Sequence, residues 1–154
     1  MMPMTNPPYL SPPSDWIMQQ AQNWPEGARI LDFAAGGGRH CCALDHAFPG
    51  RFSFLAIDRD HAALAALKAR SPQIEICQFD LEGTNIWGFA DDGFDIVIVA
   101  NYLYRPRLDD LFQLVRQAAI LLMKPLPPAM KPLAAQAILT FFYRTASWPH
   151  DCLM

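Results

Sequence analysis

The chain has 154 residues, of which 52 % are hydrophobic and 18 % charged, so it corresponds to one globular domain and not to a disordered or collagen-like protein. A net charge of −3 offers no basic surface for phosphate backbones, so we expect no nucleic-acid partner. No stretch has the roughly 18 uninterrupted apolar residues of a membrane span, and we see no secretory leader. The four cysteines form no CxxC pair. We therefore expect a cytoplasmic protein with reduced thiols and no membrane partner.

Composition divides the chain into three segments. Residues 1–13 contain five prolines and predict a flexible arm. Residues 14–115 have the alternating pattern of a folded core. Up to residue 115 the chain carries 14 acids and 8 bases, whereas residues 116–154 carry one acid and four bases. The last segment is therefore an atypical tail.

Apolar and helical stretches alternate along the core. In chain order they predict a helix over 16–23, a strand over 28–33, a glycine loop, a helix over 39–48, a strand over 52–57, a helix over 61–70, strands over 74–79 and 94–100, and a helix from 108 to about 122. Strands that alternate with helices predict an α/β fold, a Rossmann-like doubly wound parallel sheet with right-handed crossovers. We expect the sheet to be incomplete on its C-terminal side.

A polar residue follows each of four predicted strands. Asp32 precedes a loop with three consecutive glycines, and Asp58, Asp80 and Asn101 end the next three strands. Ligands of such sheets bind beyond the carboxyl ends of the strands, where a glycine loop lets them approach the backbone. A carboxylate at the second strand end suits a ribose diol, and one at the third suits an exocyclic amine.

The charge of these side chains indicates which nucleotide they suit. Asp32 beside the loop would repel a diphosphate but fits a ligand with cationic groups. The dinucleotide spacing G-x-G-x-x-G also fails, because Cys41 stands where the third glycine would be. These features favour S-adenosyl-L-methionine (SAM), whose sulfonium and ammonium groups are positive, over NAD. An NAD(P)-type oxidoreductase and a non-catalytic SAM- or nucleotide-binding remnant are the alternatives.

Four segments, in order, resemble the motifs of class I SAM-dependent methyltransferases. They are Ile30–His40 for the first motif, Ala56–Asp60 for the ribose motif, Phe79–Glu82 for the adenine motif, and Phe94–Val97 with Asn101–Pro106 for the fourth strand. The resemblance covers roughly residues 14–115. It implies methyl transfer from SAM, with S-adenosylhomocysteine as product, to an acceptor that is expected to be a small molecule.

The resemblance also implies which residues bind the cofactor. Gly36 and Gly38 would approach the methionine part, Asp58 the ribose and Asp80 the adenine amine, while Asp32 would orient the ammonium. The full implied set is Asp32, Ala34, Gly36, Gly38, His40, Asp58, Arg59, Asp80, Leu81 and Asn101.

Weaker expectations concern the acceptor. Trp16, Tyr102 and Tyr104 are candidates to face it, although packing explains Trp16 and Tyr104 equally well. Helix capping is the alternative for Asp58 and Asp80, and packing or loop bonding is the alternative for His40. No catalytic group, metal ligand or oligomeric state follows from the sequence.

The tail lacks the Pro-Gly-Gly, Tyr-Glu-Thr-Phe and Gly-Arg-Pro-Ser-Asn-Pro-Asp-Phe segments of the resembling family. The codons of the tail permit these segments in a reading frame shifted by one base. In this frame the last base of each codon is read with the first two bases of the next codon. Met123-Lys124 then contains a glutamate codon, and the codons of Ala134–Phe141 permit Gly-Arg-Pro-Ser-Asn-Pro-Asp-Phe. We hypothesise that residues 116–154 are an out-of-frame translation, which would compromise activity. In this region residues 118–123 would either extend the preceding helix or form a substitute strand.

Overall fold

The computed structural model describes residues 11–89, 93–100, 102, 104–117 and 120–124. Most of the predicted arm and of the tail, together with Asn101, lies outside this range. The elements in chain order are α1 (Asp15–Ala21), β1 (Arg29–Phe33), α2 (Arg39–Ala47), β2 (Ser53–Asp58), α3 (His61–Arg70), β3 (Glu75–Gln78), β4 (Ile96–Ala100), the 3-10 helix η2 (Arg105–Arg107), α4 (Leu108–Gln117) and β5 (Ile120–Lys124).

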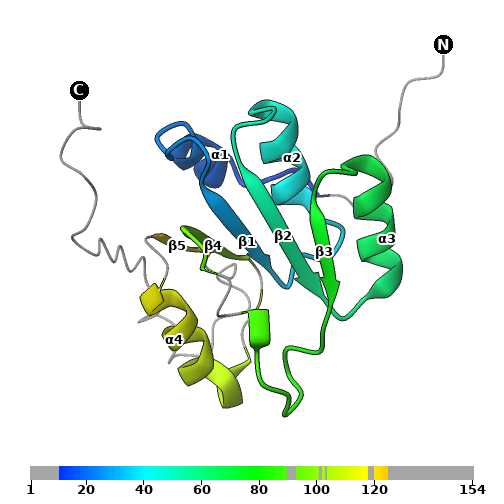
Figure 1. Ribbon diagram of the computed structural model, residues 1–154, viewed down its shortest axis with the longest axis vertical. Helices are drawn as coiled ribbons and strands as arrows, with labels where there is room; N and C mark the ends of the chain where they lie inside the picture. The colour runs from blue at the N-terminus through cyan, green and yellow to red at the C-terminus, as the bar shows by residue number, and fades with distance from the viewer. Residues whose placement is uncertain (1–10, 90–92, 101, 103, 118–119, 125–154) are drawn as a thin grey trace.

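The strands form one parallel sheet in the order β3-β2-β1-β4-β5 (Figure 1). The strand order reverses at β1, as in doubly wound folds, so the predicted Rossmann-like α/β class is confirmed. Within the described residues, no helix is both long and apolar enough to cross a bilayer.

The end of the last predicted helix differs from the expectation of a helix to about residue 122. Helix α4 ends at Gln117, and β5 pairs with β4 from Ile96↔Ile120 to Ala100↔Lys124. A short apolar run such as Ile120–Leu122 fits a buried strand or a helix equally well by periodicity. The open edge of β4 decides between them, since a strand there satisfies backbone hydrogen bonds.

Alternate side chains of the central strands enter two separate cores. Ile30, Ile96 and Ile98 join the core beneath α1, α2 and α3, whereas Leu31 and Val97 join the core that contains α4. All five are nearly fully buried. This period of two places Asp32 on the same face as Ile30, toward α2.

Gly38 makes the turn from β1 into α2 possible. It is the N-cap residue of α2, with φ +74°, a left-handed conformation that favours glycine. An added Cβ would lie 2.3 Å from Cδ1 of Leu67, a fully buried residue of α3. The loop can therefore pack under α3 only without a side chain at this position.

Substituting Gly38 with alanine is expected to destabilise the fold more than the same change at Gly50. Both glycines have a left-handed φ, but an added Cβ at Gly50 meets nothing within 4 Å. Gly50→Ala should cost about 1 kcal/mol of unfolding free energy, and Gly38→Ala about 1–3 kcal/mol more because the core around Leu67 must move. Urea denaturation of both variants measures the difference. Equal losses would contradict the packing argument.

Candidate functional site

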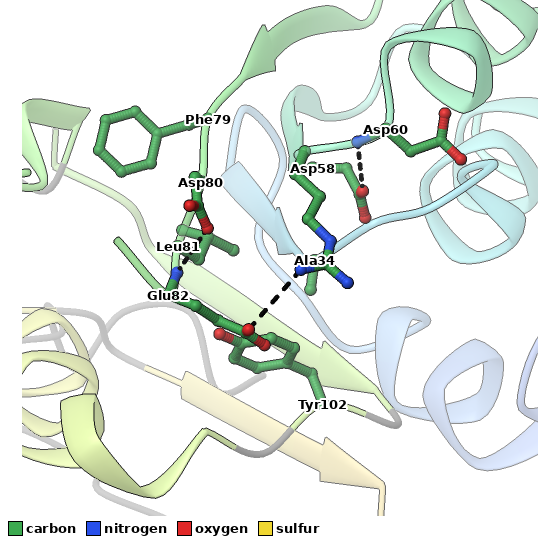
Figure 2. A pocket seen from close by; sticks show the side chains of 9 residues that line it. Ala34, Asp58, Asp60, Phe79, Asp80, Leu81, Glu82 and Tyr102 are labelled. Carbon is green, nitrogen blue, oxygen red and sulfur yellow. Dashed lines mark hydrogen bonds and ion pairs between the residues drawn. The ribbon is translucent and has the colours of Figure 1, made fainter. Parts of the chain in front are cut away.

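A pocket of about 340 Å³ opens at the carboxyl ends of β2 and β3 (Figure 2). This is within the range of roughly 300–1,000 Å³ that small-molecule sites occupy. The residues that line it are the last residue of β2 and residues of the segments that follow β1, β2, β3 and β4. They are Ala34, Asp58, Arg59, Asp60, Phe79, Asp80, Leu81, Glu82 and Tyr102.

Asp58 joins the glycine loop to the end of β2. Its Oδ2 accepts a hydrogen bond from the backbone N–H of Gly36 at 2.7 Å, and its Oδ1 accepts one from that of Asp60 at 2.9 Å. Each carboxylate oxygen has two lone pairs, so further hydrogen bonds are available to a ligand. Capping of α3 falls to Asp60, whose side chain accepts from the N–H of Ala63. Asp58 therefore does not cap the helix that follows it.

Asp80 forms the opposite wall at the end of β3. Its Oδ1 accepts from the N–H of Glu82 at 3.0 Å, and its carbonyl oxygen accepts from the N–H of Gly83 at 3.3 Å. No helix follows directly, so this carboxylate shapes a tight turn instead of a helix cap. Figure 2 shows the Asp80 and Asp58 side chains on different walls of the same pocket.

The pocket is rich in negative charge. Four of its lining residues are acids (Asp58, Asp60, Asp80 and Glu82), and the fifth charged residue is Arg59. Nη1 of Arg59 lies 3.6 Å from a carboxylate oxygen of Glu82, so this ion pair connects the loops after β2 and β3. Both side chains are solvent-accessible, and such pairs contribute little stability.

Tyr102 lines the pocket from the loop after β4. Its ring packs edge-on against Phe33 at 5.3 Å, and no described residue makes a hydrogen bond with its buried hydroxyl. Burial, reinforced by the carboxylates of Glu82 and Asp80, raises the pKa of Tyr102 to about 12. The hydroxyl is therefore protonated at neutral pH and can donate a hydrogen bond.

Asp32 lies beneath the glycine loop, outside the pocket. It is 2 % exposed, and its Oδ2 accepts from the N–H of Cys41 at 3.3 Å in the first turn of α2. Burial raises its pKa to about 6, although the hydrogen bonds from Cys41 oppose this shift. Any effect on a ligand is therefore electrostatic or passes through the loop.

The structure brings six of the expected site residues into the pocket: Ala34, Asp58, Arg59, Asp80, Leu81 and Tyr102. Gly36 adjoins it through its bond to Asp58, and a Cβ there would meet open space. Asn101 lies outside the described residues.

Besides Asp32, four expected residues lie outside the pocket. Gly38 packs against Leu67, and His40 is buried in α2. Trp16 packs against the core beneath α1, and the carbonyl of Tyr104 accepts from the N–H of Arg107. Three lining residues were not expected: Asp60, Phe79 and Glu82. All three adjoin an expected site residue within the quoted motifs, so proximity to those residues was the available signal.

A comparison with protein families matches residues 30–124 to the methyltransferase domain. This range is more than half of the chain. The chain belongs to the methyltransferase domain family. The matched range contains β2 to β5, all of β1 except Arg29, and every residue that lines the pocket.

Solved methyltransferase structures share this fold. A SAM-dependent methyltransferase from Thiobacillus denitrificans, in complex with S-adenosyl-L-homocysteine, has 17 % identity and a TM-score of 0.51, over 70 % of this chain and 45 % of that one. A TehB-like enzyme from Corynebacterium glutamicum has 22 % identity and a TM-score of 0.54, over 68 % and 59 %. A third, from Mesorhizobium loti, has 26 % identity and a TM-score of 0.50, over 67 % and 47 %.

This methyltransferase domain thus spans about half of each of these structures. A comparison with curated proteins finds no match.

Asp32 is expected to make the stability of the domain depend on pH. Because folding raises its pKa from 3.8 to about 6, this group favours the folded state below pH 4 and loses that contribution as the pH rises through 6. The Asp32→Asn variant keeps an oxygen for the Cys41 N–H but has no charge to bury. From pH 4 to 7 the wild type should lose about 2 kcal/mol of unfolding free energy relative to Asp32→Asn. Chemical denaturation at several pH values tests this, and a pH-independent difference would contradict it.

Proposed function

We propose that this domain binds SAM in the pocket at the ends of β2 and β3 and transfers its methyl group to a small-molecule acceptor. The observation that carries the proposal is the joint placement of Asp58, Asp80 and Gly36 around one pocket. The family match supports the reaction class, and the S-adenosyl-L-homocysteine in the Thiobacillus denitrificans structure supports the ligand class.

The charge of the pocket fits this cofactor. Its four carboxylates against one guanidinium disfavour a diphosphate and favour a ligand with positive groups. Asp32 adds a further carboxylate under the loop, and the charge of Asp58 is one reason for its raised pKa. A cationic ligand beside the loop would therefore relieve repulsion between two acids.

The nucleoside would lie between two walls. Asp58 has free lone pairs for the two ribose hydroxyls, and Asp80 accepts from the exocyclic amine of the base. Phe79 and Leu81 offer apolar surface to a planar ring, and Tyr102 closes the pocket on the side of the loop after β4.

The glycine loop would receive the amino-acid part of the cofactor. Ala34 and Gly36 both have left-handed backbone, with φ +57° and +56°, and the Cβ direction at Gly36 is open. Left-handed geometry at a non-glycine residue is strained and recurs at ligand sites. The Asp58–Gly36 bond holds the loop in this shape.

When bound, SAM would supply the methyl group of its sulfonium to a nucleophile of the acceptor, with S-adenosylhomocysteine as the leaving group. The side chains of the pocket would contribute mostly positioning and exclusion of water. Tyr102 stays protonated at neutral pH and therefore does not serve as a general base. We propose that a small acceptor approaches the methyl group from the side of the loop after β4, which carries Tyr102.

Isothermal titration with S-adenosylhomocysteine is expected to show one site in the wild type. Asp58→Asn and Asp80→Asn should each weaken binding about tenfold or more, since each loses a charged hydrogen-bond acceptor. Glu75→Gln is the matched control, because Glu75 is an exposed carboxylate at the opposite end of β3. Its affinity should equal that of the wild type.

Two outcomes would contradict the proposal. Binding of NAD instead of S-adenosylhomocysteine would overturn the cofactor assignment and favour an oxidoreductase. Binding of the product without methyl transfer from labelled SAM to any small-molecule fraction of a cell extract would overturn the catalytic part. The chain would then be a SAM-binding protein without activity.

A further inference from the structure

Arg107, at the junction of η2 and α4, makes three contacts although it does not line the pocket. Its Nη1 donates to the carbonyl oxygen of Gly83 at 2.7 Å, and its Nε donates to Oδ2 of Asp110 at 2.7 Å. The guanidinium carbon lies 4.5 Å from the centre of the Trp87 ring. The side chain is 14 % exposed, so these contacts are largely shielded from solvent.

Gly83 closes the turn that presents Asp80 to the pocket. Its N–H donates to the carbonyl of Asp80, and a Cβ on Gly83 would lie 3.2 Å from Oδ2 of that residue. The turn is therefore tight, and moving Gly83 would move the Asp80 carboxylate. Arg107, which is 24 positions away in the sequence, holds this glycine through its carbonyl oxygen.

Trp87 extends the same connection to the sheet. It is 6 % exposed, and its ring packs at 5.2 Å against Phe33, the last residue of β1. Between β3 and β4, the described part of the chain has no α-helix or strand. The position of the Asp80–Gly83 turn thus depends on a few tertiary contacts. Arg107 makes one of them directly, to Gly83, and supports the turn further through Trp87.

We propose that Arg107 is a positioning residue that fixes the Asp80–Gly83 turn and thereby sets the preference of the pocket for a base with an exocyclic amine. This inference rests on the proposed function, since it takes Asp80 to face the nucleobase. A lysine cannot replace Arg107 fully, because one ammonium lacks the planar fork that reaches Gly83 and Asp110 together. The bond to Asp110 anchors the guanidinium to α4, and the bond to Gly83 connects it to the Asp80–Gly83 turn.

The test compares S-adenosylhomocysteine with S-inosylhomocysteine, in which a carbonyl replaces the exocyclic amine. The wild type should bind the adenine compound about tenfold more tightly, the effect of one charged hydrogen bond. Arg107→Met should bring this ratio close to one, and Arg107→Lys should give an intermediate value. Titrations are run on the full chain at a temperature where circular dichroism shows each variant to be folded.

Arg105→Met is the matched control, because Arg105 is an exposed arginine of the same 3-10 helix. It should keep the wild-type ratio. A purely structural role for Arg107 would lower stability and leave the ratio unchanged in both Arg107 variants, which would overturn the inference. If Arg107→Met does not fold, an unchanged ratio in Arg107→Lys has the same meaning.

The two proposals fail in different ways. Equal binding of both compounds by the wild type would overturn the role of Arg107 and Asp80 in base preference, while the SAM site would stand. Absence of binding of either compound would overturn the proposed function, and the present inference with it.

Discussion

The hydrogen bond between the Asp58 carboxylate and the backbone N–H of Gly36 organises the site. It connects the loop after β1 to the end of the neighbouring strand β2. This lies at the carboxyl ends of the strands, where parallel sheets bind their ligands. The other oxygen of Asp58 holds the N–H of Asp60, so one side chain fixes the glycine loop and the start of α3 together. The pocket then needs only a second wall, and the turn after β3 supplies it.

The connection between Asp58 and Gly36 lies beside a buried carboxyl group, that of Asp32. The glycine loop lies close to two carboxylates, Asp32 beneath it and Asp58 beside it. Burial above all, with a smaller effect of the Asp58 charge, raises the pKa of Asp32. The backbone N–H groups of Cys41 and Gly36 compensate part of this cost. The rest favours a positively charged ligand, which is a physical reason for the pocket to prefer SAM over a diphosphate nucleotide.

The amino-acid pattern was sufficient to predict the sheet and much of the site. Apolar strand-like runs that alternate with helical stretches predicted the parallel sheet, and the bounds of the helix over 61–70 are those observed. Asp58 and Asp80 were expected at strand ends because a polar residue directly follows an apolar run. The expectation of a helix to residue 122 was wrong, and the alternative of a substitute strand over residues 118–123 agrees with β5, because only the edge of β4 distinguishes a strand from a helix there.

Other features depend on three-dimensional contacts that spacing does not reveal. The direction of the Asp32 side chain follows from the pleat of β1, and its burial follows from the packing of α2 against this face of the sheet. Arg107 meets Gly83 through tertiary packing alone. The interpretation of residues 116–154 as an out-of-frame translation stays a prediction, which the nucleotide sequence of the gene around codon 115 would decide.

The central claim is that a SAM-type ligand occupies the space between the Asp58–Gly36 connection and the Asp80 turn. Backbone amide NMR during titration with S-adenosylhomocysteine tests it most directly. The account predicts that the largest shifts occur at Gly36, Asp60 and Glu82, whose N–H groups bond the two carboxylates. Shifts confined to the opposite end of the strands, near Gly27 and Gly50 before the amino ends of β1 and β2, would contradict it.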